Sequence, residues 1–128
     1  MKANKTINIT FYKLLLTVRY LNELGYTPSV SGILKIITGI IDEDTDKFAL
    51  CPTFQTLVSY GSKRLSRDIN TLVSSGYLRR ILNESFSDYY FEITDNGKMI
   101  MDDFKAHHKI SLSKHETKKI PTIIKRGK

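Results

Sequence analysis

The sequence lacks most of what exported and membrane-spanning proteins depend on. It has one cysteine, Cys51, which excludes an internal disulfide and a cysteine-based zinc site. No apolar run approaches the roughly 20 residues that span a bilayer, and residues 1–5 are too polar for a signal peptide. These absences predict a cytoplasmic protein that has no membrane partner.

Groups that carry chemistry are also scarce. The histidines are His107, His108 and His115, and consecutive side chains on a helix point apart, so they do not form a metal pair. No GxxxxGK[ST] phosphate loop occurs, and no paired carboxylates or activated nucleophile stand out. We expect Cys51 to be a buried structural residue. The sequence therefore predicts a protein that is not an enzyme, with no catalytic residues, no metal and no cofactor.

Positive charge is concentrated at one end of the chain. The net charge is +7, and residues 1–104 contain equal numbers of acidic and basic residues, so the whole excess belongs to residues 105–128. We predict one domain over residues 1–109 and a flexible basic tail over 110–128. The tail is expected to contact nucleic acid by charge alone, and a solubilising tail or an anionic membrane contact are the other interpretations. Its cations are Lys114, Lys118, Lys119, Lys125, Arg126 and Lys128.

The first apolar repeat predicts a helix over residues 10–24, ended by Gly25. A second apolar stripe follows on its other side at intervals of four, formed by Tyr12, Leu16 and Tyr20. That stripe is either the face of a homodimer or the second buried side of a centrally packed helix. The sequence favours neither interpretation.

Two further helices are predicted before the middle of the chain. The first covers residues 30–38 and is ended by Gly39. An acidic loop over 42–52 then leads to a short helix over 52–58, because Pro52 suits the first turn of a helix.

The best-defined helix precedes Gly76 and is the fourth in the chain. Its apolar face is formed by Leu65, Ile69, Leu72 and Val73. Two runs rich in aromatic and branched side chains follow, over 77–82 and 89–93, and predict a β-hairpin. Thr94 can then cap a last helix.

The order of these elements predicts a mainly α-helical fold with a small β-hairpin (α+β), arranged as a winged helix-turn-helix. In that arrangement one helix lies along a nucleic-acid groove, and the hairpin, or wing, contacts the backbone beside it. Cations and short donors at the start of the fourth helix and on the first strand suit phosphates, so we predict a nucleic acid as the partner, with DNA and RNA both open at this point. A solvated surface is the other interpretation. The candidate contacts are Lys63, Arg64, Arg67, Asn70, Thr71, Arg79 and Arg80.

Five short runs carry a family pattern: FYKLL at 11–15, ILKIITG at 33–39, YG at 60–61, LVSSGYL at 72–78 and ITDNG at 93–97. Together they resemble the RQC domain, the winged-helix module of RecQ-type helicases. The resemblance implies binding to duplex ends, junctions or folded DNA. It also implies a grip on phosphates from Ser62 to Arg67, which adds Ser62 and Ser66 to the candidates. Because a helicase phosphate loop is missing, we expect a small stand-alone DNA-binding protein of bacterial origin.

Phe86 stands in the expected hairpin loop, where polar residues and glycine are usual. An aromatic side chain there can stack on a base or wedge into a duplex end. Packing against the body of the protein or against a partner are the other interpretations. Two other functions stay open, a dimeric transcription regulator that binds a palindromic site and a protein-interaction module.

Overall fold

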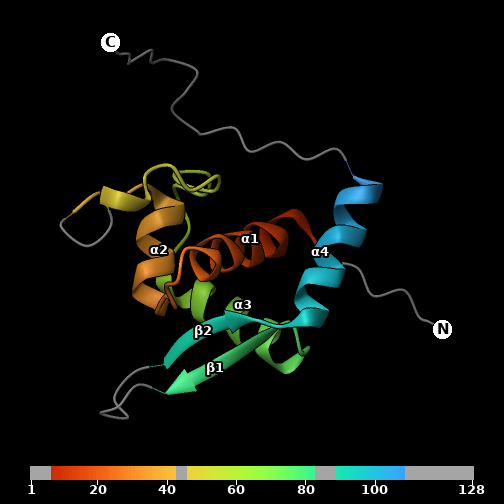
Figure 1. Ribbon diagram of the computed structural model, residues 1–128. Helices are drawn as coiled ribbons and strands as arrows, with labels where there is room; N and C mark the ends of the chain where they lie inside the picture. Colours follow the sequence, from red (N-terminus) through yellow and green to blue (C-terminus); the bar gives the residue numbers. More distant parts are fainter. Residues whose placement is uncertain (1–6, 43–45, 83–88, 109–128) are drawn as a thin grey trace.

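The computed structural model describes residues 7–42, 46–82 and 89–108. In these residues four α-helices and one antiparallel hairpin pack together (Figure 1), which confirms the predicted α+β class. The elements are α1 (Ile9–Glu23), α2 (Val30–Thr38), the 3₁₀ helix η1 (Asp46–Phe48), α3 (Ser62–Ser74), β1 (Leu78–Leu82), β2 (Tyr89–Ile93) and α4 (Asp95–His107).

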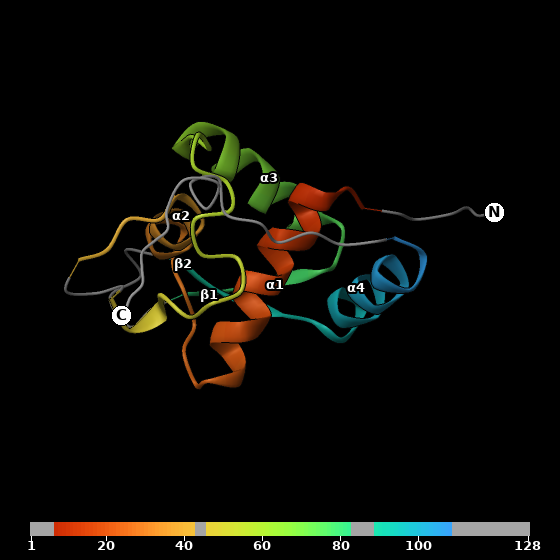
Figure 2. The ribbon, with the colours of Figure 1, turned by 90° about the horizontal axis from the view of Figure 1, so that it is seen from above.

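Helix α1 lies at the centre of the molecule. It contacts α2, α3, α4 and β2, and two perpendicular views place it between α2 and α4 (Figure 1, Figure 2). Leu14, Leu15 and Val18 are fully buried in the main core. The helix begins one residue earlier than predicted, because the Asn8 side chain caps it and accepts a hydrogen bond from the Phe11 N–H at 2.7 Å.

Local start and stop signals set the ends of the other helices. The Ser29 hydroxyl accepts from the Gly32 N–H at 3.2 Å and caps α2, and Thr94 accepts from the Gly97 N–H at 3.0 Å and caps α4. Gly39 ends α2 with a φ of +86°, a left-handed conformation that glycine adopts at little cost. Helix α2 thus has the bounds that the sequence predicted.

The short helix predicted over residues 52–58 is wrong, because these residues form consecutive turns. The N–H groups of Gln55 and Leu57 donate to the carbonyl oxygens of Ile36 and Ile37, at 2.9 and 2.8 Å. Those carbonyls lie in the last turns of α2, where a helix runs out of donors of its own. The segment therefore satisfies the end of α2 and bonds to itself only within single turns, as where the Thr56 N–H donates to the Thr53 carbonyl at 3.1 Å. Gln55 adopts a φ of +64°, which is incompatible with a right-handed helix.

The hairpin is anchored to the helices through β2. Strands β1 and β2 pair with Leu78 opposite Ile93, close to the predicted bounds. The Asn22 side chain of α1 accepts from the Ile93 N–H at 2.8 Å and donates to the Phe91 carbonyl at 3.3 Å. The Phe91 N–H donates to the Pro28 carbonyl at 2.9 Å. The outer edge of β2 is thus bonded to α1 and to the chain that enters α2, which holds the hairpin beside the helices.

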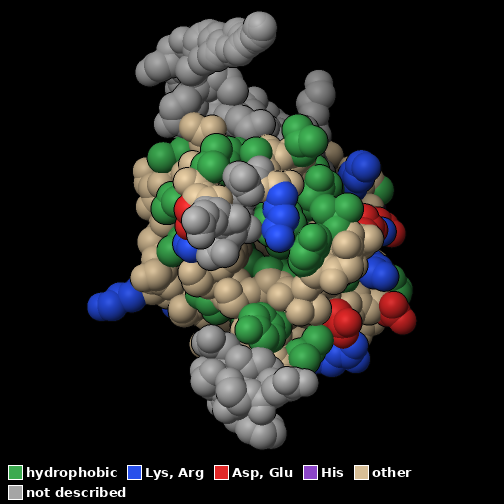
Figure 3. All heavy atoms as spheres, turned by 60° about the vertical axis from the view of Figure 1, so that its left-hand side comes forward, with side chains coloured by type: hydrophobic (Ala, Val, Ile, Leu, Met, Phe, Trp, Pro, Cys, Tyr) green, Lys and Arg blue, Asp and Glu red, His purple; other side chains and the backbone are tan. Residues whose placement is uncertain are grey.

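A second, smaller core lies between α1, α2 and the turns that follow α2. It is formed by Leu21, Ile36, Cys51 and Phe54. The surface of this part of the chain exposes Ile40, Ile41 and Leu50. Figure 3, which brings the α2 side of the molecule forward, shows hydrophobic side chains spread over much of that face.

Candidate nucleic-acid interface

Helix α3 has one buried and one exposed face. Leu65, Ile69 and Leu72 are at most 1% exposed and pack in the main core, as their helical spacing predicted. The opposite face carries cations and short hydrogen-bond donors. Its members are Lys63, Arg64, Ser66, Arg67, Asn70, Thr71 and Ser74. The exposed face thus contains every α3 candidate except Ser62, which is exposed at the first position of the helix.

Asp68 is the only acidic residue of α3, and it lies at the edge of this cationic face. Its side chain is 12% exposed and accepts a hydrogen bond from the Tyr60 hydroxyl. Burial, and then that hydrogen bond, raises the pKa of Tyr60. The Nε atoms of Arg64 and Arg67 lie 3.7 and 4.0 Å from the carboxylate, and their side chains stay 56% and 74% exposed. Two guanidinium groups therefore share one carboxylate, and positive charge remains at the surface.

The hairpin separates the two arginines of β1, because consecutive strand residues point to opposite faces. Arg80 turns toward α3, where its Nη2 donates to Asn70 Oδ1 at 2.6 Å. Its guanidinium carbon also lies 5.4 Å from the centroid of the Tyr89 ring. Arg79 stands opposite Glu92 and forms an ion pair with it. The α3 surface therefore includes Arg80 and not Arg79, a separation that the sequence did not predict.

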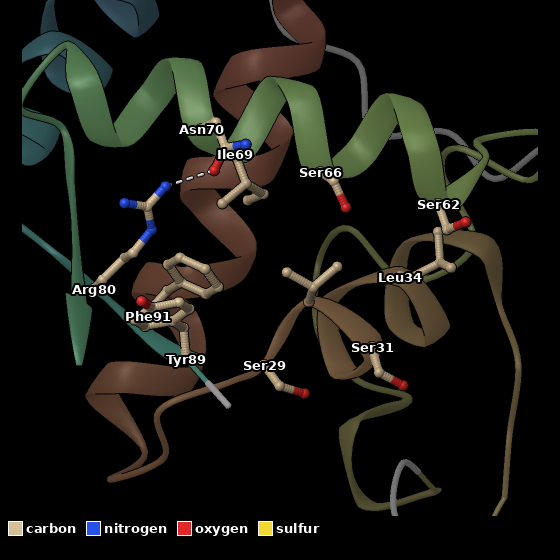
Figure 4. Close-up of a pocket in the computed structure, with 11 residues that line it drawn as sticks. Ser29, Ser31, Leu34, Ser62, Ser66, Ile69, Asn70, Arg80, Tyr89 and Phe91 are labelled. Atoms are coloured by element: carbon tan, nitrogen blue, oxygen red, sulfur yellow. Dashed lines mark hydrogen bonds between the residues drawn. The ribbon is translucent and has the colours of Figure 1, made fainter. Parts of the chain in front are cut away.

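Helix α3, the start of α2 and the hairpin enclose an open groove of about 830 Å³ (Figure 4). The groove is lined by Ser29, Val30, Ser31, Leu34, Ser62, Ser66, Ile69, Asn70, Arg80, Tyr89 and Phe91. Figure 4 shows that its two ends differ in chemistry. Arg80, Asn70 and Tyr89 gather at the hairpin end, and the hydroxyl groups of Ser31 and Ser62 lie at the other end.

The lining of the groove is rich in donors. None of the described residues that line it carries a carboxylate, and its polar groups are one guanidinium, one amide and several hydroxyls. Ser29 is the N-cap of α2, so the positive end of that helix dipole also lies at the groove. This chemistry favours a ligand that is anionic or rich in hydrogen-bond acceptors.

Other predicted contacts lie away from the groove or outside the described residues. Arg64, Arg67 and Thr71 are on the solvent side of α3 and do not line the groove. Phe86 and the tail cations lie outside the described residues, so their contacts remain predictions. Those tail cations are Lys114, Lys118, Lys119, Lys125, Arg126 and Lys128.

The second apolar stripe of α1 packs largely against its own chain. Tyr12 is 5% exposed and stacks on Phe104 of α4, with ring centroids 5.2 Å apart. Leu16 and Tyr20 are half-buried and line a hollow of about 290 Å³ beside α4. The Tyr12 side chain is thus buried against α4 of its own chain. A homodimer through this stripe stays a prediction.

The sequence did not single out Ser29, Ser31 or Tyr89 as parts of the site. Ser29 was recognisable as a helix cap, and Tyr89 as the start of a strand. The hairpin register, which pairs Leu82 with Tyr89, puts Tyr89 on the same face as Arg80. That register was open in the sequence because alternation along the first strand is not clean.

The described residues contain no group of three His, Cys, Asp or Glu side chains that could hold a metal ion. None of the helices they form is both long and apolar enough to cross a membrane. Comparison of the chain with protein-family models, with curated proteins and with solved structures gives no match, so the functional argument rests on the site itself.

Proposed function

We propose that this protein binds DNA without catalysing a reaction, and that α2, α3 and the hairpin act as a winged helix-turn-helix. One observation carries the proposal. Ser62, Ser66 and Asn70 of α3 and Arg80 of the hairpin line a single groove that is rich in donors and, among the described residues, free of carboxylates. The cations of α3 stand on the exposed side of the same helix, outside the lining of the groove. A polyanion suits such a surface, because each phosphate oxygen accepts hydrogen bonds and attracts cations.

Each element has a distinct part in this proposal. Lys63 and Arg67 neutralise phosphates from the exposed face of α3, and the serine hydroxyls of the groove donate to a backbone strand. The hairpin contacts the neighbouring backbone, with Phe86 stacking on a base or opening a duplex end. The sequence resemblance to the RQC domain favours duplex ends and forks as targets.

A salt titration of binding tests the proposal. Fluorescence anisotropy would measure affinity for blunt duplex, forked duplex and single-stranded DNA at several salt concentrations. Wild-type protein should bind with an affinity that falls steeply as salt rises, because each phosphate contact releases counterions. The double variant Lys63→Glu/Arg67→Glu should lose at least about ten-fold in affinity for the preferred substrate. Arg64 is left unchanged, because it packs over the Tyr60 ring beside Asp68.

A matched control reverses two charges on α4. Lys98 and Lys105 are exposed and do not line the groove, so Lys98→Glu/Lys105→Glu should retain most of the affinity. Equal losses in the two double variants would show attraction by net charge alone and would contradict the proposed site. Weak binding that ignores salt would favour a protein-interaction module. A dimer with a discrete footprint on random-sequence DNA would favour a regulator that binds a palindrome.

A further inference from the structure

The orientation of the Asn70 amide is set by Arg80. A guanidinium group can only donate hydrogen bonds, so the Asn70 atom that faces Arg80 Nη2 at 2.6 Å is the acceptor Oδ1. The nitrogen Nδ2 therefore points away from Arg80 (Figure 4). Within the described part of the chain, no acceptor takes a hydrogen bond from Nδ2. Asn70 thus offers two free N–H donors, and its oxygen is turned toward Arg80.

The hairpin end of the groove combines these donors with a flat apolar surface. Arg80 keeps N–H groups beyond the one that it gives to Asn70. The Tyr89 ring stands beside the guanidinium and is 49% exposed. Ile69 and Phe91 line the same end but are at most 2% exposed, so the Tyr89 ring supplies its exposed apolar surface. A ligand that fits here has an apolar face and an edge that only accepts hydrogen bonds.

We propose that this end of the groove selects guanine through the base edge that carries O6 and N7. Guanine presents two neighbouring acceptors on that edge, whereas adenine presents the N7 acceptor and the N6 amino donor. The usual contact of asparagine with adenine needs both its oxygen and its nitrogen to face the base, and the oxygen of Asn70 faces Arg80 instead. The inference rests on the proposed function and names the base that the same surface prefers.

Both exclusion and attraction contribute to this preference. An adenine in the groove would place its amino group against the Asn70 and Arg80 donors, which leaves donors unpaired on both sides. A phosphate would satisfy the donors but has no flat face to lie against the Tyr89 ring. The hydroxyl groups of Ser31 and Ser62 at the opposite end suit a backbone phosphate better.

The test replaces one guanine of the nucleic acid by related bases that differ in their hydrogen-bonding groups. Anisotropy titrations would use the substrate that wild-type protein binds best, in four versions. The first contains guanine, the second 7-deazaguanine, which lacks N7, and the third hypoxanthine, which keeps O6 and N7 but lacks the 2-amino group. The fourth contains adenine. Wild-type protein should lose about ten-fold in affinity with 7-deazaguanine and at least as much with adenine, and should bind the hypoxanthine version as tightly as the guanine version.

Variants of the chain identify the residues that select the base. Asn70→Asp keeps an oxygen for Arg80 and removes the Nδ2 donors, and Asn70→Ala removes the donors without adding charge. Both should abolish the difference between guanine and 7-deazaguanine. Ser74→Ala, one helical turn later on the exposed face of α3 and outside the lining of the groove, is the matched control and should keep that difference. Thermal unfolding followed by circular dichroism would establish that each variant is folded.

Two outcomes would overturn the inference in different ways. In the first, wild-type protein binds all four versions equally while Asn70→Ala weakens binding to all of them. Asn70 and Arg80 would then contact phosphate, which refutes base selection and leaves DNA binding in place. If wild-type protein binds none of the substrates, the proposed function fails and the base preference fails with it.

Discussion

The carboxylate of Asp68 organises the cationic end of α3 at the level of single residues. Tyr60 donates a hydrogen bond to it, and the guanidinium groups of Arg64 and Arg67 lie within 4.0 Å. The Arg64 guanidinium carbon also lies 4.9 Å from the centroid of the Tyr60 ring. One acid therefore keeps two cations close together at the surface, at the cost of part of their net charge.

Tyr60 makes the stability of the protein depend on pH in the alkaline range. Its pKa is raised by burial and by its hydrogen bond to Asp68, so the folded protein holds the phenol neutral while the unfolded chain loses the proton near pH 10. The titration of Tyr60 should leave the free energy of unfolding unaffected below that pH and should lower it as pH rises further. Tyr60→Phe should show a shallower fall, and about 1–3 kcal/mol less stability at neutral pH because Asp68 loses its donor.

Urea denaturation at neutral pH and above pH 10 would measure both effects. The difference between wild type and variant isolates Tyr60 from the other groups that titrate in this range. Parallel declines of the two proteins with pH would contradict the role assigned to Tyr60.

At the scale of elements, the first turn of α4 joins α3, the hairpin and α4. Thr94 accepts from the Gly97 N–H and donates to the Gly76 carbonyl at the end of α3, at 2.6 Å. A Cβ atom on Gly97 would collide with the Tyr77 carbonyl oxygen and lie 2.8 Å from Ile93 Cγ1. The threonine and the glycine of the ITDNG run therefore serve as cap and as site of close approach, which explains their spacing physically.

Two glycine-to-alanine changes should have opposite effects on stability. Alanine favours a helix over glycine by about 1 kcal/mol. In Gly97→Ala the collision with the hairpin backbone outweighs that gain, so the free energy of unfolding should fall by about 2 kcal/mol. In Gly32→Ala the new Cβ meets only the Ser29 hydroxyl at 3.6 Å, so α2 should be stabilised by up to about 1 kcal/mol. Urea denaturation of both variants measures the contrast, and changes of the same sign would refute this account of α4.

At the scale of the whole molecule, shape and charge belong to different parts of the chain. The groove is built by residues 29–91, whereas the entire net charge of +7 belongs to residues 105–128. Helix α4 lies on the opposite side of α1 from α2 (Figure 1, Figure 2). The 20 residues that follow His108 can extend to at most about 70 Å, so their length does not prevent contact with DNA held at the groove.

Deletion of residues 110–128 should therefore weaken binding without changing the base preference. Affinity should fall for every substrate, and the dependence of log K on log salt should become shallower by several units, because up to six cations are lost. Lys63→Ala, which removes one cation from the domain, should reduce the same slope by about 1. Anisotropy titrations in a salt series measure both slopes. An unchanged slope after the deletion would assign the tail no contact with DNA.

The sequence by itself determined the four α-helices, the hairpin and much of their bounds, but not the conformation of residues 46–58. The caps at Asn8, Ser29 and Thr94, the stop at Gly39 and the apolar repeat of α3 act within one or two helical turns, so they are visible without the fold. The cationic face of α3 followed from the same periodicity. Local signals of this kind depend only on neighbours in the chain.

Tertiary structure alone decided how these elements meet. Residues 52–58 form turns because the N–H groups of Gln55 and Leu57 satisfy the end of α2. Arg79 and Arg80 separate because they lie on opposite faces of the hairpin. The pairing of Arg80 with Asn70, and with it the groove, depends on β1 packing beside α3. These contacts join residues far apart in the chain, and which of them form is set by the burial of the shared core, not by the preference of any single segment.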